Sequence, residues 1–254
     1  MCGSVGEYPA LDLDETKAVI SASGDADDGT VPLIVGSGQA AAIAPRLAAA
    51  VAGAGASGIL VCPFMYSEPA VDGLVEHFRR LAAASGLGLI IYTTDGQVYS
   101  LEQLLGLAEL DAVVGLKDEW GDLRLFSQAR ERIGDRWAWI NGMAELQAAQ
   151  YAVLGADAFT SGLINVAPHL TLAVRDAIER QDWEGLQLLA TRIRPFAAMR
   201  ARRPGYSIAV IKEAMAMQGQ PGGGRVRPPI AQVSADDRVE LEAVMRSLAA
   251  PAEA

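Results

Sequence analysis

Short apolar runs alternate with amphipathic stretches along the chain from residue 31 onward. Each run is apolar at successive positions, which is typical of parallel strands that are buried on both faces. Strands are predicted at residues 31–36, 58–63, 87–93, 111–118, 137–141 and 156–161. Helices are predicted between them at residues 39–52, 71–84, 101–110, 123–133 and 144–154. After the last strand only helices are predicted, at residues 168–180, 183–202, 207–218 and from 236 onward.

Regular alternation of strands and helices predicts an α/β fold, either a (β/α)8 TIM barrel or an open, doubly wound sheet. The barrel is favoured because no Gly-x-Gly-x-x-Gly turn follows a predicted strand. The turn Gly36-Ser37-Gly38 is too short a match. One barrel of about 250 residues would use the whole chain of 254 residues.

The number of predicted strands falls short of a closed barrel. Six follow residue 30, and residues 2–7 are interpreted as the tail of one more, whereas a barrel has eight. We therefore expect a barrel that lacks its first βα unit and most of its second strand, roughly 40 residues. Residues 1–168 would form this incomplete barrel. Residues 169–254 would form the last barrel helix and a C-terminal helical extension, packed as one unit with the barrel.

Three explanations for the short N-terminus stay open at this point. The start site of an ordinary enzyme is misassigned, the chain is a decaying relative, or the barrel is completed by self-association. Loss of part of a closed barrel exposes strand edges and removes core contacts, which lowers stability and favours aggregation.

Composition narrows the class of function. With 51% hydrophobic and 20% charged residues the chain can bury a sizeable core. No apolar run reaches the roughly 18 residues of a membrane span, and the net charge of −10 argues against nucleic acid and anionic membranes. Two cysteines and two histidines show no metal-ligand spacing. We expect a cytoplasmic protein without a disulfide framework, metal or cofactor.

Lys117 is the most informative residue, because it is one of three lysines and follows the apolar run Val113-Val114-Gly115-Leu116. A buried ammonium costs several kcal/mol unless it is paired or loses its proton. A buried, uncharged lysine amine is the usual nucleophile for forming an imine with a ketone or aldehyde. The alternative interpretation is a strand-end lysine that reaches solvent.

Three other segments at predicted strand ends carry polar groups. The turn Gly3-Ser4-Val5-Gly6-Glu7 offers a hydroxyl and backbone N–H groups to an anion such as a carboxylate. Tyr92 ends an apolar strand next to the strand of Lys117, where a phenol can relay protons. Small residues around Ser161 and Asn165 leave room for a ligand. The alternative interpretations are that Gly3–Glu7 is an ordinary turn and that Tyr92 only packs in the core.

Together, in this order, these segments resemble the dihydrodipicolinate synthase / N-acetylneuraminate lyase family of class I aldolase-type barrels, over residues 2 to about 247. The resemblance implies that Lys117 is the Schiff-base lysine, that Tyr92 is the catalytic tyrosine, and that the glycine turn with Ser4 and Val5 binds the substrate carboxylate. Further matching segments are Pro63-Phe64-Met65-Tyr66, Gly73-Leu74-x-x-His77-Phe78 and Ser161-Gly162-x-x-Asn165-x-x-Pro168.

Towards the C-terminus the chain is most similar to the branch that contains 5-dehydro-4-deoxyglucarate dehydratase. The segments that carry this similarity are Pro204-Gly205-Tyr206-Ser207 and Val226-Arg227-Pro228-Pro229. In several family members the counterpart of Tyr66 enters the site of a neighbouring subunit, which implies a homodimer or homotetramer. Ser161 and Asn165 would contact the rest of the substrate.

Departures from the family pattern put the substrate in doubt. Val5 stands where the family usually has a proton-passing threonine, so the relay must use Ser4, water or Tyr66. Thr94 and Gln97 stand where two branches carry an arginine for a substrate carboxylate. The resemblance implies a Schiff-base-forming lyase that acts on pyruvate or a 2-keto sugar acid. The alternatives are a 5-dehydro-4-deoxyglucarate dehydratase, and a truncated, inactive relative or sugar-acid binding protein.

Overall fold

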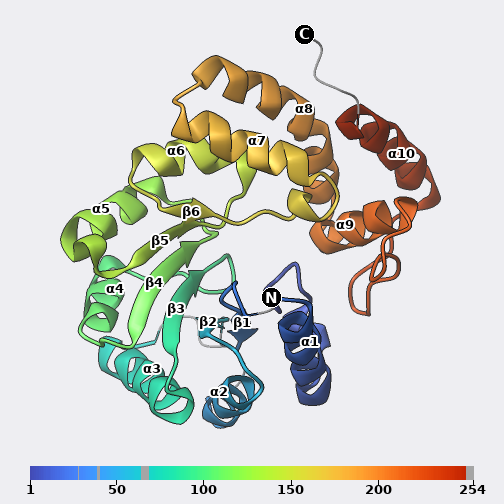
Figure 1. The fold of residues 1–254 in the computed structure, drawn as a ribbon. Helices are drawn as coiled ribbons and strands as arrows, with labels where there is room; N and C mark the ends of the chain where they lie inside the picture. Colours follow the sequence, from blue (N-terminus) through green and yellow to red (C-terminus); the bar gives the residue numbers. More distant parts are fainter. Residues whose placement is uncertain (28, 39–40, 64–68, 250–254) are drawn as a thin grey trace. The chain divides into compact units, whose positions relative to one another are not determined.

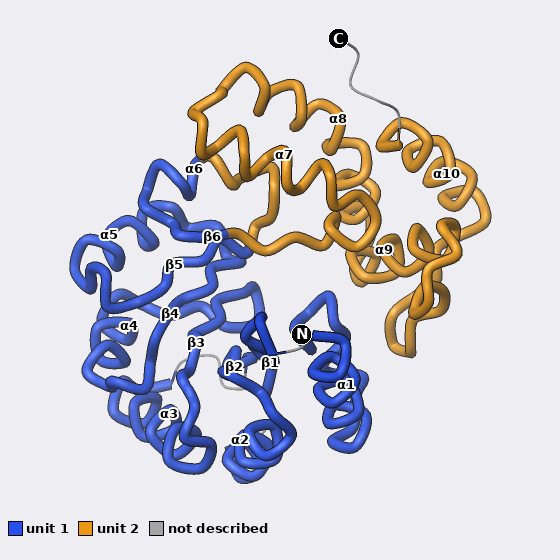
Figure 2. The backbone as a smooth tube through the Cα atoms, in the orientation of Figure 1, with its two compact units in different colours: residues 1–142, 150–158 blue, residues 143–149, 159–254 orange. Residues whose placement is uncertain are grey.

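A computed structural model describes residues 1–27, 29–38, 41–63 and 69–249. The chain forms two compact units, each described here by itself (Figure 2). The first comprises Met1–Gly142 and Gln150–Ala158, and the second comprises Met143–Ala149 and Phe159–Ala254. The predicted division at residues 168 and 169 stays a prediction.

The sheet contains six strands that pair in chain order (Figure 1). They are β1 (Ile34–Ser37), β2 (Gly58–Val61), β3 (Gly88–Thr93), β4 (Val113–Asp118), β5 (Ala138–Asn141) and β6 (Ala158–Phe159). The pairs from β1 to β5 are all parallel. A doubly wound sheet reverses its strand order, whereas a barrel wall does not. The predicted α/β class with a parallel sheet is therefore confirmed, in a strand order consistent with a TIM barrel.

Helices follow each of the first five strands. They are α2 (Ala44–Gly53), α3 (Val71–Ser85), α4 (Leu101–Ala108), α5 (Leu123–Ile133) and α6 (Ala148–Val153), with 3-10 turns η2 (Gly134–Arg136) and η3 (Glu145–Gln147). Figure 1 shows α2 to α5 side by side along one face of the sheet. Each presents an apolar stripe to the strands, for example Leu74, Phe78 and Leu81 of α3. Other strand residues, among them Leu60, Cys62 and Ile90, form a separate buried cluster with Tyr92.

A helix that we did not predict precedes the sheet. It is α1 (Leu13–Ala26), which follows the 3-10 turn η1 (Tyr8–Ala10). Its N-terminus has a capping box, in which the Asp12 carboxylate accepts from the Glu15 N–H and the Glu15 carboxylate accepts from the Asp12 N–H. This pattern was a sequence signal for the helix. The hydrophobic pattern of α1 is weak, because Ile20 is the one buried residue in Leu13–Ala26.

Several predicted boundaries are wrong. The helix predicted at residues 39–52 begins at Ala44, since Pro45 is accepted only in the first turn of a helix; residues 39 and 40 lie outside the described ranges. The segment 144–154 divides into η3 and α6, and the strand predicted at 156–161 is only Ala158–Phe159. Residues 2–7 form a turn, but Met1 pairs with β1 through Gly36 N–H to Met1 O at 2.9 Å and Met1 N to Ile34 O at 2.6 Å.

The second unit is helical. After the 3-10 turn η4 (Leu163–Asn165) come α7 (Pro168–Glu179), α8 (Trp183–Ala201), α9 (Tyr206–Met217) and α10 (Ala235–Ala249). Helix α8 packs against the other three, and its buried residues Ile193, Phe196 and Met199 recur every three positions. Among the helices in the described ranges, none has the length and apolar character to cross a membrane.

Candidate active site

Tyr92 and Lys117 face each other across neighbouring strands. They are register partners in the β3–β4 pair, so both project at the carboxyl ends of parallel strands. Tyr92 is fully buried, and the Lys117 side chain is 13% exposed. Lys117 Nζ lies 4.2 Å from the centroid of the Tyr92 ring, a cation–π contact. The structure thus brings together the two residues for which we predicted a catalytic role.

Glu119 joins these two residues, and the sequence interpretation missed it. Lys117 Nζ donates to Glu119 Oε2 at 3.2 Å, and the Tyr92 hydroxyl donates to the same oxygen. The Glu119 backbone N–H bonds to Thr93 O at 2.8 Å, which continues the β3–β4 ladder by one residue. Residues i and i+2 of a strand lie on one face. An acidic residue two positions after a buried lysine was therefore a usable signal.

Ser4 completes the hydrogen-bond chain from the N-terminal turn. Its Oγ lies 2.8 Å from the Tyr92 hydroxyl oxygen. The single phenolic proton goes to Glu119, so Ser4 acts as the donor to Tyr92. The turn itself is closed by Glu7 N–H to Ser4 O at 3.1 Å and Tyr8 N–H to Gly3 O at 3.2 Å. The N–H of Glu7, one of those predicted to bind a carboxylate, thus closes the turn instead.

An apolar layer lies beneath the polar groups. Leu60, Cys62, Ile90 and Tyr92 form one buried cluster, with Tyr8, Ile34 and Ile140 packed against it. Burial raises the pKa of the Cys62 thiol to about 12 and that of the Tyr8 hydroxyl to about 12. Such a surrounding strengthens every electrostatic interaction above it, because little water screens the charges.

The pKa of Tyr92 is raised well above its ordinary value. The largest cause is burial, and the nearby negative charge of Glu119 and the hydrogen bond to it act in the same direction. Burial and a neighbouring anion both disfavour the phenolate. Tyr92 therefore holds its proton at neutral pH and is a proton donor in the resting site.

Asp118 anchors the end of β4 from the other side of the strand. This buried carboxylate accepts hydrogen bonds from the hydroxyls of Thr93 and Tyr151 and from the Trp120 N–H at 3.1 Å. Because successive strand residues alternate between faces, this network fixes the backbone while Lys117 and Glu119 face the site. Asp118 thus holds the end of β4, which carries Lys117 and Glu119, in a fixed position.

The other predicted site residues are placed as follows. Val5 is half-buried in the turn beside Ser4, and Tyr66 lies outside the described residues. Ser161 and Asn165 belong to the second unit. The Ser161 hydroxyl donates to the buried carboxylate of Glu145, and Asn165 Nδ2 donates to Gly162 O at 3.0 Å. Their contact with a substrate stays a prediction.

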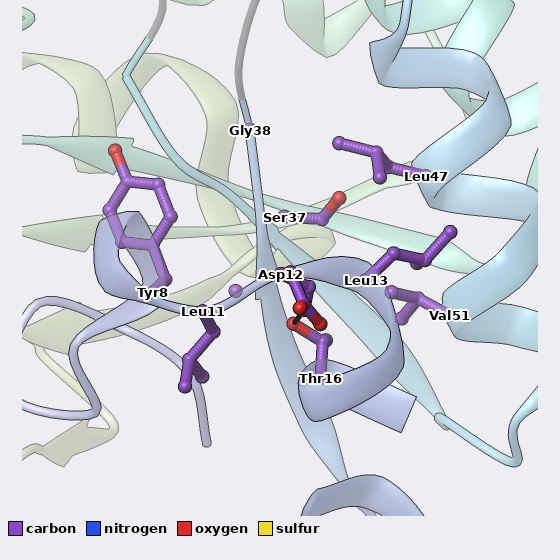
Figure 3. Close-up of a pocket in the computed structure, with 10 residues that line it drawn as sticks. Tyr8, Leu11, Asp12, Leu13, Thr16, Ser37, Gly38, Leu47 and Val51 are labelled. Carbon is purple, nitrogen blue, oxygen red and sulfur yellow. Dashed lines mark hydrogen bonds between the residues drawn. The ribbon is translucent and has the colours of Figure 1, made fainter. Parts of the chain in front are cut away.

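A small cavity adjoins the first strand (Figure 3). It has about 30 Å³ of space, lined by Tyr8, Ser37, Leu47 and the start of α1 at Asp12 and Thr16. In Figure 3 the oxygens of Asp12 and Thr16 lie close together at its edge. A volume of this size holds about one or two water molecules. The cavity is too small for an organic acid, so the polar groups around Lys117 are the stronger candidate for an active site.

Gly36 sets the position of the turn that carries Ser4. A Cβ atom at residue 36 would lie 1.8 Å from the Cys2 carbonyl oxygen, so the backbone would have to move. We expect Gly36→Ala to destabilise the fold by roughly 1–3 kcal/mol and to displace Ser4 from Tyr92. Thermal melts would measure the first effect. Gly53→Ala in α2 is the matched control, because its Cβ would meet nothing within 4 Å; an equal loss in both variants would contradict the explanation.

The site holds the groups that imine chemistry requires. Lys117 supplies a nitrogen nucleophile, Tyr92 a proton donor and Glu119 a proton acceptor, all within one hydrogen-bonded chain. Among the described residues, no group of three or more His, Cys, Asp or Glu side chains is placed to hold a metal ion.

Comparisons with known proteins match nearly the whole chain. The model described as "Dihydrodipicolinate synthetase family" matches residues 1–248. A protein of Saccharopolyspora erythraea, named "Probable 5-dehydro-4-deoxyglucarate dehydratase", is 34% identical over 257 residues, which cover 99% of this chain and 82% of that protein. A Streptomyces coelicolor protein, named "Probable 5-dehydro-4-deoxyglucarate dehydratase 1", is 35% identical over 247 residues, 94% of this chain and 78% of that one.

A solved structure is similar over the same length. It is the dihydrodipicolinate synthase from Oceanobacillus iheyensis, with a TM-score of 0.88 and 30% identity. The match covers 97% of this chain and 82% of that chain. Similarity in sequence and in fold therefore extends over both units.

Proposed function

The chain belongs to the dihydrodipicolinate synthetase family, and on this premise we propose that it is a Schiff-base-forming lyase that dehydrates a 2-keto sugar acid. The observation that carries the proposal is Lys117 Nζ, which lies in a largely buried position against Tyr92 and Glu119. A lysine beside a proton donor and a proton acceptor is the arrangement that imine formation requires.

The substrate class is suggested by the relatives named as dehydratases of 5-dehydro-4-deoxyglucarate. Numbered from its keto end, this molecule has a carboxylate at C1, a ketone at C2, a methylene at C3 and a hydroxyl at C4. Lys117 would attack C2 and form an imine with loss of water. The imine draws electrons from C3, so that Glu119, the proton acceptor beside Lys117, can take a C3 proton, and the C4 hydroxyl, protonated by Tyr92, can depart as a second water.

The roles of the other site residues follow from their contacts. Tyr92 would protonate the departing oxygen, since its raised pKa keeps the phenol protonated at neutral pH. Ser4 would hold Tyr92 and, with backbone N–H groups of its turn, receive the substrate carboxylate. Condensation with aspartate semialdehyde is a less suitable reaction, because Gln97 stands where the synthase branch carries an arginine for the carboxylate of that substrate.

Reduction by borohydride in the presence of pyruvate is expected to attach the reduced pyruvate imine to Lys117. An imine that forms reversibly becomes a stable secondary amine when it is reduced, so peptide mass spectrometry would locate it. Pyruvate is the probe because it contains the C1 carboxylate and C2 ketone common to the proposed substrates.

Two controls make this trapping experiment decisive. Lys117→Arg should give no adduct, and Lys17, which is exposed on α1, should stay unmodified in the wild-type protein. A folded wild-type sample that yields no adduct at Lys117 would refute the Schiff-base proposal and favour a sugar-acid binding protein or an inactive relative.

A further inference from the structure

A single carboxylate oxygen lies between the nucleophile and the proton donor of the site. Glu119 Oε2 accepts from Lys117 Nζ at 3.2 Å and from the Tyr92 hydroxyl. The two donors therefore share one acceptor atom. A carboxylate that only balanced the lysine charge would have no need to contact the phenol as well.

The backbone holds Glu119 in this place. Its N–H bonds to Thr93 O, and Gly142 N–H bonds to Asp118 O at 2.6 Å, so β3 and β5 both support the end of β4. A Cβ at residue 142 would lie 2.9 Å from the Cβ of Glu119, which explains why a glycine suits that position. The Glu119 side chain is 33% exposed, so its outer part is open to a ligand.

We propose that Glu119 is a catalytic proton carrier that moves protons from Lys117 to Tyr92 during imine formation, a role that rests on the proposed function. Glu119 takes a proton from the Lys117 ammonium, and the free amine then bonds to C2 while the C=O π bond breaks. Tyr92 protonates the new oxygen and is reprotonated by Glu119. A second transfer along the same path takes a proton from the lysine nitrogen, which is now bonded to C2, and protonates the C2 hydroxyl, which leaves as water.

The protons balance in this sequence. The lysine nitrogen begins as NH3⁺ and ends as the protonated imine with one hydrogen, and the two protons it loses leave with the carbonyl oxygen as water. Glu119 and Tyr92 return to their starting states. No oxidant, reductant or additional reactant is required.

Other titratable groups near Lys117 and Glu119 are less suited to this role. Groups that interact with the pair electrostatically include Tyr92, the Cys62 thiol and the Met1 amino group. Burial raises the thiol pKa and lowers the amino pKa, and neither group has a hydrogen bond to Lys117 Nζ among the described residues. On β5, the register partner of Lys117 is the apolar Ile140.

Glu119→Gln is expected to slow imine formation with pyruvate by about 10²–10⁴-fold, the usual contribution of a positioned acid or base. The amide keeps the size of the side chain but cannot take a proton. The rate of borohydride trapping should be measured across the pH range. The pH profile of the wild-type rate should contain an acid part that depends on Glu119 and that the variant lacks.

Two further variants separate proton transfer from a structural role. Glu119→Asp should keep the acid part of the profile at a lower rate, and Glu119→Ala should regain rate when formate is added, because formate supplies a carboxylate. Glu109→Gln, which removes an exposed charge at the end of α4, should behave as wild type. If Glu119→Gln fails to fold, the formate response of Glu119→Ala decides.

The outcomes distinguish this inference from the proposed function. If the wild-type protein forms no adduct, the Schiff-base function fails, whatever Glu119 does. If the wild-type protein forms the adduct and Glu119→Gln keeps its rate and pH profile, the function stands and the role of Glu119 is overturned. A slow Glu119→Ala variant that formate does not accelerate would reduce Glu119 to a positioning residue.

Discussion

Lys117→Arg is expected to lower the turnover of a 2-keto sugar acid by about 10⁴-fold or more, the scale seen when a covalent nucleophile is lost. Arginine keeps a positive charge beside Glu119, but its guanidinium does not lose its proton and forms no imine. Turnover would be measured with 5-dehydro-4-deoxyglucarate, by the loss of water from the substrate. Because the Lys117 side chain is largely buried against Tyr92, substrate binding should change less than turnover.

The matched control for this variant is Lys17→Arg. Lys17 forms an exposed ion pair with Asp14 on α1, 3.7 Å from Nζ to Oδ1, so the same substitution there should leave turnover and melting temperature unchanged. A Lys117→Arg protein that melts cooperatively and keeps turnover within roughly tenfold of wild type would show that no covalent bond to Lys117 is needed.

The sequence allowed Lys117 and Tyr92 to be found because each ends an apolar run, and neighbouring parallel strands end at the same edge. Their register in the β3–β4 pair agrees with that reasoning. Strands that are buried on both faces are apolar at successive positions, so the pattern locates each strand and the polar residue at its end. The roles assigned to both residues await the experiments above.

Glu119 was missed for a physical reason. Its contact with Tyr92 depends on where the chain goes after β4 ends, and the hydrophobic pattern does not determine that path. The bond from Glu119 N–H to Thr93 O keeps the residue in the plane of the sheet for one more position. The same limit applies to Ser4, which is 88 residues from Tyr92 in the sequence. Its distance from Tyr92 in space depends on the pairing of Met1 with β1, which the hydrophobic pattern does not determine.

Helix boundaries failed where local chemistry outweighed periodicity. Pro45 moved the start of α2, and the capping box at Asp12 and Glu15 begins a helix whose apolar stripe is nearly absent. Side-chain caps and proline act on one turn of helix, whereas a hydrophobic pattern is averaged over a longer window. Reading both signals together would have recovered α1.

Tyr92→Phe is expected to lower kcat by about 10²–10⁴-fold, or roughly 3–5 kcal/mol in the activation free energy, with a smaller change in KM. The substitution keeps the ring that packs on Lys117 and removes only the hydroxyl that bonds to Ser4 and Glu119. Since burial and Glu119 raise the pKa of this phenol, the wild-type profile should show no loss of rate from Tyr92 ionisation at neutral or mildly alkaline pH. Steady-state kinetics across pH would measure both effects.

Tyr99→Phe supplies the matched control, because Tyr99 is also fully buried but its hydroxyl has no hydrogen-bond partner among the described residues. Removing a buried, unsatisfied hydroxyl should leave stability unchanged or slightly higher and should not alter kcat. A proton donor is needed at Tyr92 and not at Tyr99, so the two variants separate chemistry from packing. Equal kinetics for both would mean that another group protonates the leaving oxygen, and the relay from Lys117 through Glu119 would then have to end elsewhere.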